Sequence, residues 1–128
     1  MSSKFLLDSS AVLKLFIVED HSRAMTVFAQ SNLRYLFGSK LLIPEVLGNL
    51  AKLGQPTGQA ADFLTSISLV EINARVLQRS IPIVGGGLRT LDAIHLATAL
   101  ELGDAVLVSY DEKLAERASL HGVQILRP

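Results

Sequence analysis

The chain has 128 residues, of which 49% are hydrophobic and 19% charged, and its 12 basic and 12 acidic residues cancel to a net charge of zero. This composition excludes a disordered tail and provides no overall positive field, so a nucleic-acid partner would need a local basic patch or a bridging cation. The absence of cysteine excludes disulfides and thiolate metal sites, which leaves oxygen, with imidazole as a helper, to bind any metal ion.

The length is typical of one domain, and we expect residues 1–128 to form a single domain around one core. The opening stretch MSSKFLLDSS has too short an apolar run for a secretory signal, and no apolar stretch is long enough to span a bilayer. We therefore expect a cytoplasmic protein with no membrane association. The high apolar content also predicts an apolar surface that a partner covers.

Strands and helices alternate in the first half of the chain. The pattern predicts, in order, a strand over Lys4–Asp8, helices over Ala11–Glu19 and Ser22–Ser31, an extended piece over Leu33–Gly38, and helices over Pro44–Leu53 and Gln59–Ser66. Ser9 and Ser10 are the expected caps of the first helix, because serine hydroxyls accept hydrogen bonds from the free N–H groups of a first turn.

The same alternation continues in the second half. The pattern predicts a strand over Leu69–Ile72, a weak helix over Ala74–Arg79, a loop over Ser80–Gly87, a helix that Thr90 caps and Gly103 ends, a strand over Ala105–Ser109, a helix over Asp111–Ser119 and a strand over Val123–Leu126. Strands that alternate with helices predict an α/β fold, a three-layer α/β/α sandwich with a mainly parallel central sheet.

Four acidic residues lie where strands end or helices begin. Asp8 ends the first strand and Asp111 follows the strand AVLVS, while Glu45 and Asp92 lie in the first turns of their helices. Each alone has an ordinary explanation, because carboxylates favour helix N-termini. In an open parallel sheet, however, the carboxyl ends of the strands and the helix N-termini gather at one edge. We therefore expect the four residues, here named the acidic cluster, to converge there.

Carboxylates that converge repel one another and are costly to desolvate unless a cation neutralises them. Hard divalent cations suit a site made only of oxygen ligands. One or two Mg²⁺ or Mn²⁺ ions would activate water and stabilise the extra negative charge of a phosphodiester in its transition state. Such ions would also recruit an anionic substrate to a protein of zero net charge.

Four stretches carry a family resemblance: LLDSSAVLKLF near the start, SKLLIPEVLGNLAK from Ser39, LRTLDAIHLATAL from Leu88, and LVSYDEKLAERASLHGVQILRP at the end. Together they resemble a PIN domain over essentially the whole chain, and are most similar to the VapC-type toxins of prokaryotic toxin–antitoxin pairs. The resemblance implies a Mg²⁺- or Mn²⁺-dependent endoribonuclease that hydrolyses RNA, a cognate antitoxin and a homodimer. Its catalytic, metal-binding acids fall on Asp8, Glu45, Asp92 and Asp111, and its supporting hydroxyl falls on Ser109.

The chain departs from this family pattern at two points. Pro44 directly precedes Glu45 in a segment that the family makes helical from about Ser39, so the helix is expected to start late or kink, and the aim of Glu45 stays open. Basic residues are scattered, so no RNA-binding face is legible and the substrate-binding residues are unknown. Lys14 and Arg89 could touch RNA phosphates, with simple solvation as an equal alternative.

His95 follows Asp92 by one helical turn and could reach the acidic cluster as a ligand or a general acid. Within an apolar helix, however, a histidine more often satisfies a buried hydrogen bond, and the resemblance assigns this position no role. We therefore favour a structural histidine. The residues of this helix that we expect in the core are Leu91, Ile94, Leu96, Ala97 and Leu100.

Two rival functions stay open. A catalytically inactive PIN-like binding or regulatory module would keep the fold, although it would have no need of four costly carboxylates. A receiver-like phospho-acceptor domain also gathers acids at strand ends, but it needs a lysine after a late strand, and AVLVSYD offers none at Ser109 or Tyr110. For the dimer and the antitoxin, the candidate surfaces are the helices over Ala11–Val18 and Gln59–Ile67.

Overall fold

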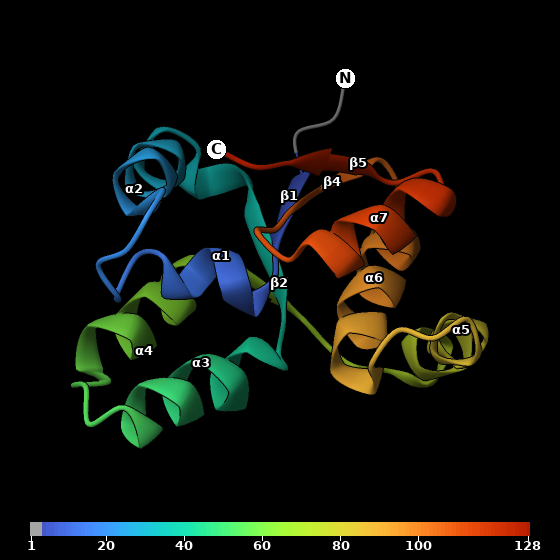
Figure 1. Ribbon diagram of the computed structural model, residues 1–128, viewed down its shortest axis with the longest axis horizontal. Helices are drawn as coiled ribbons and strands as arrows, with labels where there is room; N and C mark the ends of the chain where they lie inside the picture. Colours follow the sequence, from blue (N-terminus) through green and yellow to red (C-terminus); the bar gives the residue numbers. More distant parts are fainter. Residues whose placement is uncertain (1–3) are drawn as a thin grey trace.

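Five strands form one parallel sheet at the centre of the fold, which a computed structural model describes for residues 4–128 (Figure 1). Residues 1–3, which the predicted domain also includes, lie outside the described residues. The strands are β1 (Lys4–Leu7), β2 (Leu36–Ser39), β3 (Ser68–Val70), β4 (Ala105–Val108) and β5 (Gln124–Leu126). They pair in the order β3-β2-β1-β4-β5, and each of these four pairs is parallel.

Helices cover both faces of the sheet. Within residues 4–128 they are α1 (Ser9–Leu13), α2 (Ser22–Ser31), the 3₁₀ turn η1 (Leu33–Tyr35), α3 (Leu42–Lys52), α4 (Gly58–Ser66), α5 (Ala74–Gly85), α6 (Thr90–Leu102) and α7 (Glu112–Leu120). Figure 1 shows α1 to α4 on one side of the strands and α5 to α7 on the other. The predicted three-layer α/β/α sandwich with a parallel sheet is therefore confirmed. In this part of the chain, every helix is too short or too polar to span a bilayer.

Helices bury both faces of the sheet. Consecutive residues of a strand point to opposite sides, so each strand packs against both helical layers. Leu6 and Leu107 pack with side chains of α5, α6 and α7, whereas Leu7 and Val108 pack with those of α1 to α4. All four side chains are fully buried. Burial of each contributes about 1.5–3 kcal/mol relative to exposure. Because apolar side chains fill both faces of the sheet, the polar side chains of a site can gather only at its edges.

The strand order creates a switch point beside β1. From β1 the chain adds β2 and β3 on one side, then returns to add β4 and β5 on the other. In open α/β sheets, ligands bind outside the carboxyl ends of the strands at such a point. Leu7 pairs with Val108, so the residues that follow these two strands, Asp8 and Ser109, emerge side by side.

The first helix differs from its prediction. It spans Ser9–Leu13 rather than Ala11–Glu19, and its cap is Asp8, whose side chain accepts a hydrogen bond from the N–H of Ala11. Because Asp8 caps the helix, Ser9 and Ser10 form its first turn instead of capping it. After Leu13 the chain continues as a tighter turn, in which the N–H of Phe16 donates a hydrogen bond to the carbonyl of Leu13, three residues earlier, at 3.1 Å.

The loop that was predicted over Ser80–Gly87 is mostly helix. Asn73 caps α5 by accepting a hydrogen bond from the N–H of Val76, and the helix runs through Pro82 to Gly85. Pro82 lacks the N–H that would bond the preceding turn, which weakens the helix locally. Ser80 and Ile83 are nevertheless buried, and α5 packs chiefly against α6. Tertiary packing therefore outweighs the local effect of the proline.

Two details of α3 and α6 matter for the site. α3 begins at Leu42, so Pro44 lies in its first turn, where its missing N–H has no helical partner to lose. The expected late start relative to Ser39 is confirmed. α6 begins at Thr90 with Arg89 in the cap position and no side-chain cap bond, so the predicted Thr90 cap is wrong.

Candidate active site

Asp8 is held rigidly at the carboxyl end of β1. Its Oδ1 accepts hydrogen bonds from the N–H of Ala11 at 2.9 Å and from the hydroxyl of Ser10 at 2.7 Å. Its Oδ2 accepts one from the hydroxyl of Ser109 at 2.5 Å. The residue is only 3% exposed. Three donors, two in α1 and one directly after β4, therefore fix both oxygens of this carboxylate.

Ser109 ties the two central strands together at this edge. Besides donating to Asp8, its oxygen accepts a hydrogen bond from the N–H of Asp111 at 3.0 Å. Asp111 in turn caps α7, since its Oδ1 accepts from the N–H of Leu114 at 3.1 Å. The hydroxyl of Ser10 also accepts from the N–H of Tyr110 at 2.9 Å. The hydroxyl of Ser109 thus bonds a carboxylate of the acidic cluster.

Glu45 reaches the site from α3 and meets a buried histidine of α6. The Nε2 of His95 lies 2.5 Å from the Oε1 of Glu45, and the two side chains are 0% and 13% exposed. The other ring nitrogen of His95, Nδ1, is buried without a hydrogen-bond partner among the described residues. The expectation of a buried, hydrogen-bonded histidine is confirmed, and its partner belongs to the acidic cluster.

Asp92 lies in the first turn of α6, where the free N–H groups and the helix dipole favour a negative charge. Its side chain is 15% exposed, and its Oδ2 accepts a hydrogen bond from the Nε of Arg89 at 3.4 Å. Leu91, predicted as a core residue, is 46% exposed instead. It lies in the first turn of α6 and lines the same cavity as Asp92.

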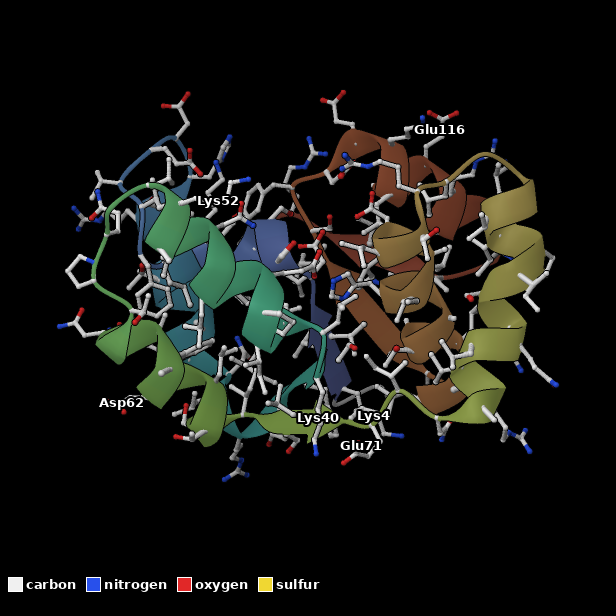
Figure 2. All side chains as sticks on the ribbon, turned by 90° about the horizontal axis from the view of Figure 1, so that it is seen from below. Lys4, Lys40, Lys52, Asp62, Glu71 and Glu116 are labelled. Carbon is white, nitrogen blue, oxygen red and sulfur yellow. The ribbon has the colours of Figure 1, made fainter. Side chains whose placement is uncertain are left out.

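The structure brings the whole acidic cluster to one cavity. This cavity has a volume of about 630 Å³ and lies where α3 and α6 face each other, on the side of the molecule seen in Figure 2. The four acids of its lining are Asp8, Glu45, Asp92 and Asp111. Other lining residues are Ser9, Ser10, Leu13, Asn49, Lys52, Arg89, Thr90 and Leu91. The predicted convergence at one edge of the sheet is therefore confirmed.

Two of these carboxylates are disfavoured as anions. Burial raises the pKa of Asp8, against the opposing effect of its hydrogen bonds from Ser109 and Ser10. Burial, followed by repulsion from Asp111, also raises the pKa of Asp92, while Arg89 acts in the opposite direction. Both effects penalise the negative charge, and a cation between the carboxylates would relieve them.

The donor set fits a hard divalent cation. All four acids offer carboxylate oxygens, the ligands that Mg²⁺ and Mn²⁺ prefer, and the chain has no thiolate to favour a softer metal. In residues 4–128, no group of three or more acidic, histidine or cysteine side chains lies close enough together to hold a metal ion between them. The carboxylates instead surround an open cavity, which leaves room for a substrate beside an ion.

Two polar residues of the lining were missed from the sequence. Asn49 and Lys52 follow Glu45 by four and seven positions, which places all three on one face of α3. That spacing is the signal that could have identified them. Of the two cations proposed earlier as phosphate contacts, Arg89 lines the cavity, whereas Lys14 pairs with Glu19 at 3.2 Å.

The fold and this acidic cavity define the class of protein. Residues 5–120 match the PIN domain, and the chain therefore belongs to the PIN domain family. It is 34% identical over 125 residues to Ribonuclease VapC46 of Mycobacterium tuberculosis, an alignment that covers 95% of each chain.

Solved structures support the same fold. The toxin VapC20 of Mycobacterium tuberculosis, which cleaves the sarcin–ricin loop, superposes with a TM-score of 0.80 at 16% identity, over 98% of this chain and 100% of that one. A toxin–antitoxin complex from Klebsiella pneumoniae contains a chain that superposes with a TM-score of 0.77 at 22% identity, over 98% of both chains.

Proposed function

We propose that this PIN domain protein is a VapC-type ribonuclease, the toxin of a toxin–antitoxin pair, and that it hydrolyses RNA with the help of Mg²⁺ or Mn²⁺. The observation that carries the proposal is one cavity lined by all four residues of the acidic cluster. A relative that aligns over nearly the whole chain is itself a ribonuclease. The raised pKa of Asp8 and of Asp92 adds a physical reason for a cation in this cavity.

The acidic cluster would hold the cation, directly or through water. When bound, a divalent cation supplies activation of water and charge stabilisation of the phosphodiester in its transition state. The hydrogen bonds from Ser10 and Ser109 pre-orient Asp8 and leave it little freedom to turn away. Asp111 is held by its cap bond to α7, and Asp92 by the first turn of α6. The positions of these three carboxylates are thus fixed by the strand end and the helix starts that carry them.

Lys52 and Arg89 are the groups that would bind the RNA phosphates. Both line the cavity with the acidic cluster, at the last turn of α3 and the start of α6. Four carboxylates and two cations leave a formal excess of two negative charges, the charge that one divalent ion neutralises. The side chain of Lys52 has no ion-pair or hydrogen-bond partner within residues 4–128, so its ammonium group is available to a phosphate oxygen.

An antitoxin and a second copy of the chain are the protein partners we propose. Support comes from the toxin–antitoxin complexes among the solved neighbours. The stretches predicted as partner surfaces, Ala11–Val18 and Gln59–Ile67, meet where the rings of Phe16 and Phe63 are 5.9 Å apart. These rings line a mainly apolar hollow of about 430 Å³. An apolar antitoxin segment would bury this surface.

The test is cleavage of RNA by purified Asp92→Asn, with Asp62→Asn as the matched control. Asp62 is an exposed acid of α4 that lies outside the cavity, so the control makes the same chemical change and the same change in net charge (Figure 2). We expect Mn²⁺-dependent cleavage by the wild type and the control, and loss of cleavage by folded Asp92→Asn. Unchanged cleavage by Asp92→Asn contradicts the proposal. A wild type that neither cleaves RNA nor is stabilised by Mn²⁺ would be an inactive binding module.

A further inference from the structure

A buried histidine, His95, contacts a residue of the acidic cavity without lining the cavity itself. His95 is fully buried in α6, among apolar neighbours such as Ile94 and Leu96. Burial of a polar ring without a partner costs free energy, so a fully buried histidine calls for a specific partner. The only hydrogen bond that the side chain of His95 makes among the described residues is to the Oε1 of Glu45, at 2.5 Å.

The contact determines which ring nitrogen carries the proton. The carboxylate of Glu45 can only accept, so the Nε2 of His95 donates to it. The other ring nitrogen, Nδ1, has no partner within the described residues, so no second hydrogen bond competes for the orientation of the ring. The Nε2–H group is therefore the donor that the ring presents to Glu45.

The same geometry excludes His95 as a direct ligand. Its Nε2 is already bonded to Glu45, its Nδ1 is buried, and the residue is absent from the lining of the cavity. Any effect on the cavity must therefore pass through Glu45. That side chain is long and comes from α3, 50 positions away in the sequence from the helix that carries His95. Without the ring, no other hydrogen bond among the described residues holds the Glu45 carboxylate.

We propose that His95 is a positioning residue, which holds Oε1 of Glu45 against α6 and so leaves the second oxygen, Oε2, available to a cation in the cavity. This inference rests on the proposed function, because it gives Glu45 a cation to bind. In many metal sites, a carboxylate or carbonyl group orients a metal-binding histidine through a hydrogen bond. Here the roles are reversed, because the histidine orients the carboxylate that would bind the metal. Loss of such a partner lowers metal affinity or activity by about 10–100-fold.

The test compares His95→Gln with His95→Met. The side-chain amide of glutamine places an N–H donor near the position of Nε2. Glutamine has no counterpart of Nδ1, but this loss breaks no hydrogen bond, because Nδ1 has no partner among the described residues. Methionine fills a similar volume with a flexible apolar chain but donates nothing. Mn²⁺ affinity is measured by titration calorimetry, and kcat and KM for RNA are measured at saturating Mn²⁺. Thermal unfolding in EDTA checks that each variant is folded.

We expect His95→Met to weaken Mn²⁺ binding about 10–100-fold, with KM for RNA nearly unchanged, and His95→Gln to restore most of the affinity. In a Glu45→Ala background, His95→Met should cause no further loss of Mn²⁺ affinity. Wild-type affinity in His95→Met, an equal loss in folded His95→Gln, or an additional loss in the Glu45→Ala background each overturns the inference. If His95→Met fails to fold, the affinity of His95→Gln alone decides. Mn²⁺ binding that follows these expectations without RNA cleavage would instead overturn the proposed function.

Discussion

Removal of the Ser109 hydroxyl is expected to loosen the junction between the two central strands. In Ser109→Ala, Asp8 loses a donor at 2.5 Å and the N–H of Asp111 loses an acceptor at 3.0 Å. A hydrogen bond to a charged group is worth about 1.5–3 kcal/mol and a neutral one about 0.5–1.5 kcal/mol. Because Ser109 is fully buried, water cannot replace the hydroxyl without opening the site. We therefore expect the free energy of unfolding to fall by about 2–4 kcal/mol.

The measurement is urea unfolding at neutral pH, with Ser80→Ala as the matched control. Ser80 is also buried, at 6% exposure, but its hydroxyl donates to the carbonyl of Leu77 within the same helix, at 2.6 Å. Such bonds add little to a helix, so the control should change the free energy of unfolding by less than about 1 kcal/mol. Equal losses in both variants would refute the reasoning, because the junction would then be worth no more than any buried hydroxyl.

Three further predictions concern the cavity. Burial raises the pKa of Asp8, so the stability that this group contributes is present at low pH and is lost as pH rises through its folded pKa. Asp8→Asn should therefore raise Tm of the metal-free protein at neutral pH and flatten the pH dependence of Tm above about pH 4, the ordinary pKa of an aspartate, and an unchanged thermal unfolding profile would contradict this. Mn²⁺ at about 100 times its Kd should stabilise the wild type by about 2.7 kcal/mol, and EDTA should reverse the effect. This stabilisation should be smaller in Asp92→Asn, and a full response would contradict the assignment of Asp92. Lys52→Gln in an Asp92→Asn background should weaken RNA binding and lower its salt slope by about one, whereas Lys40→Gln, before the opposite end of α3, should not (Figure 2); equal effects would show that only net charge matters.

The sheet and the acidic cluster could be predicted because their signals are local. Buried parallel strands appear as short apolar runs such as AVLVS, and the acids directly follow these runs or the starts of helices. Once the elements alternate, the topology brings the strand ends together without further information. The catalytic role of the four acids stays a prediction until it is tested by mutation.

Features that depend on distant parts of the chain could not be predicted. Proline and three glycines predict a loop after Arg79, yet burial of Ile83 against α6 keeps the segment helical. The exposure of Leu91 depends on the open cavity beside the first turn of α6, which the sequence of that helix does not encode. The partner of His95 lies 50 positions away on α3, and no spacing rule connects the two.

The pairing of β1 with β4 has a consequence for the order of events during synthesis. Lys4 pairs with Ala105, and Asp8 receives its hydrogen bond from Ser109 across 101 positions. Contacts this distant in sequence form only after most of the chain has left the ribosome. A nascent or truncated chain therefore has no assembled cavity. For an enzyme proposed to cut RNA, this means that an unfinished chain is inactive. Translation of each toxin molecule is nearly complete before that molecule can cleave RNA.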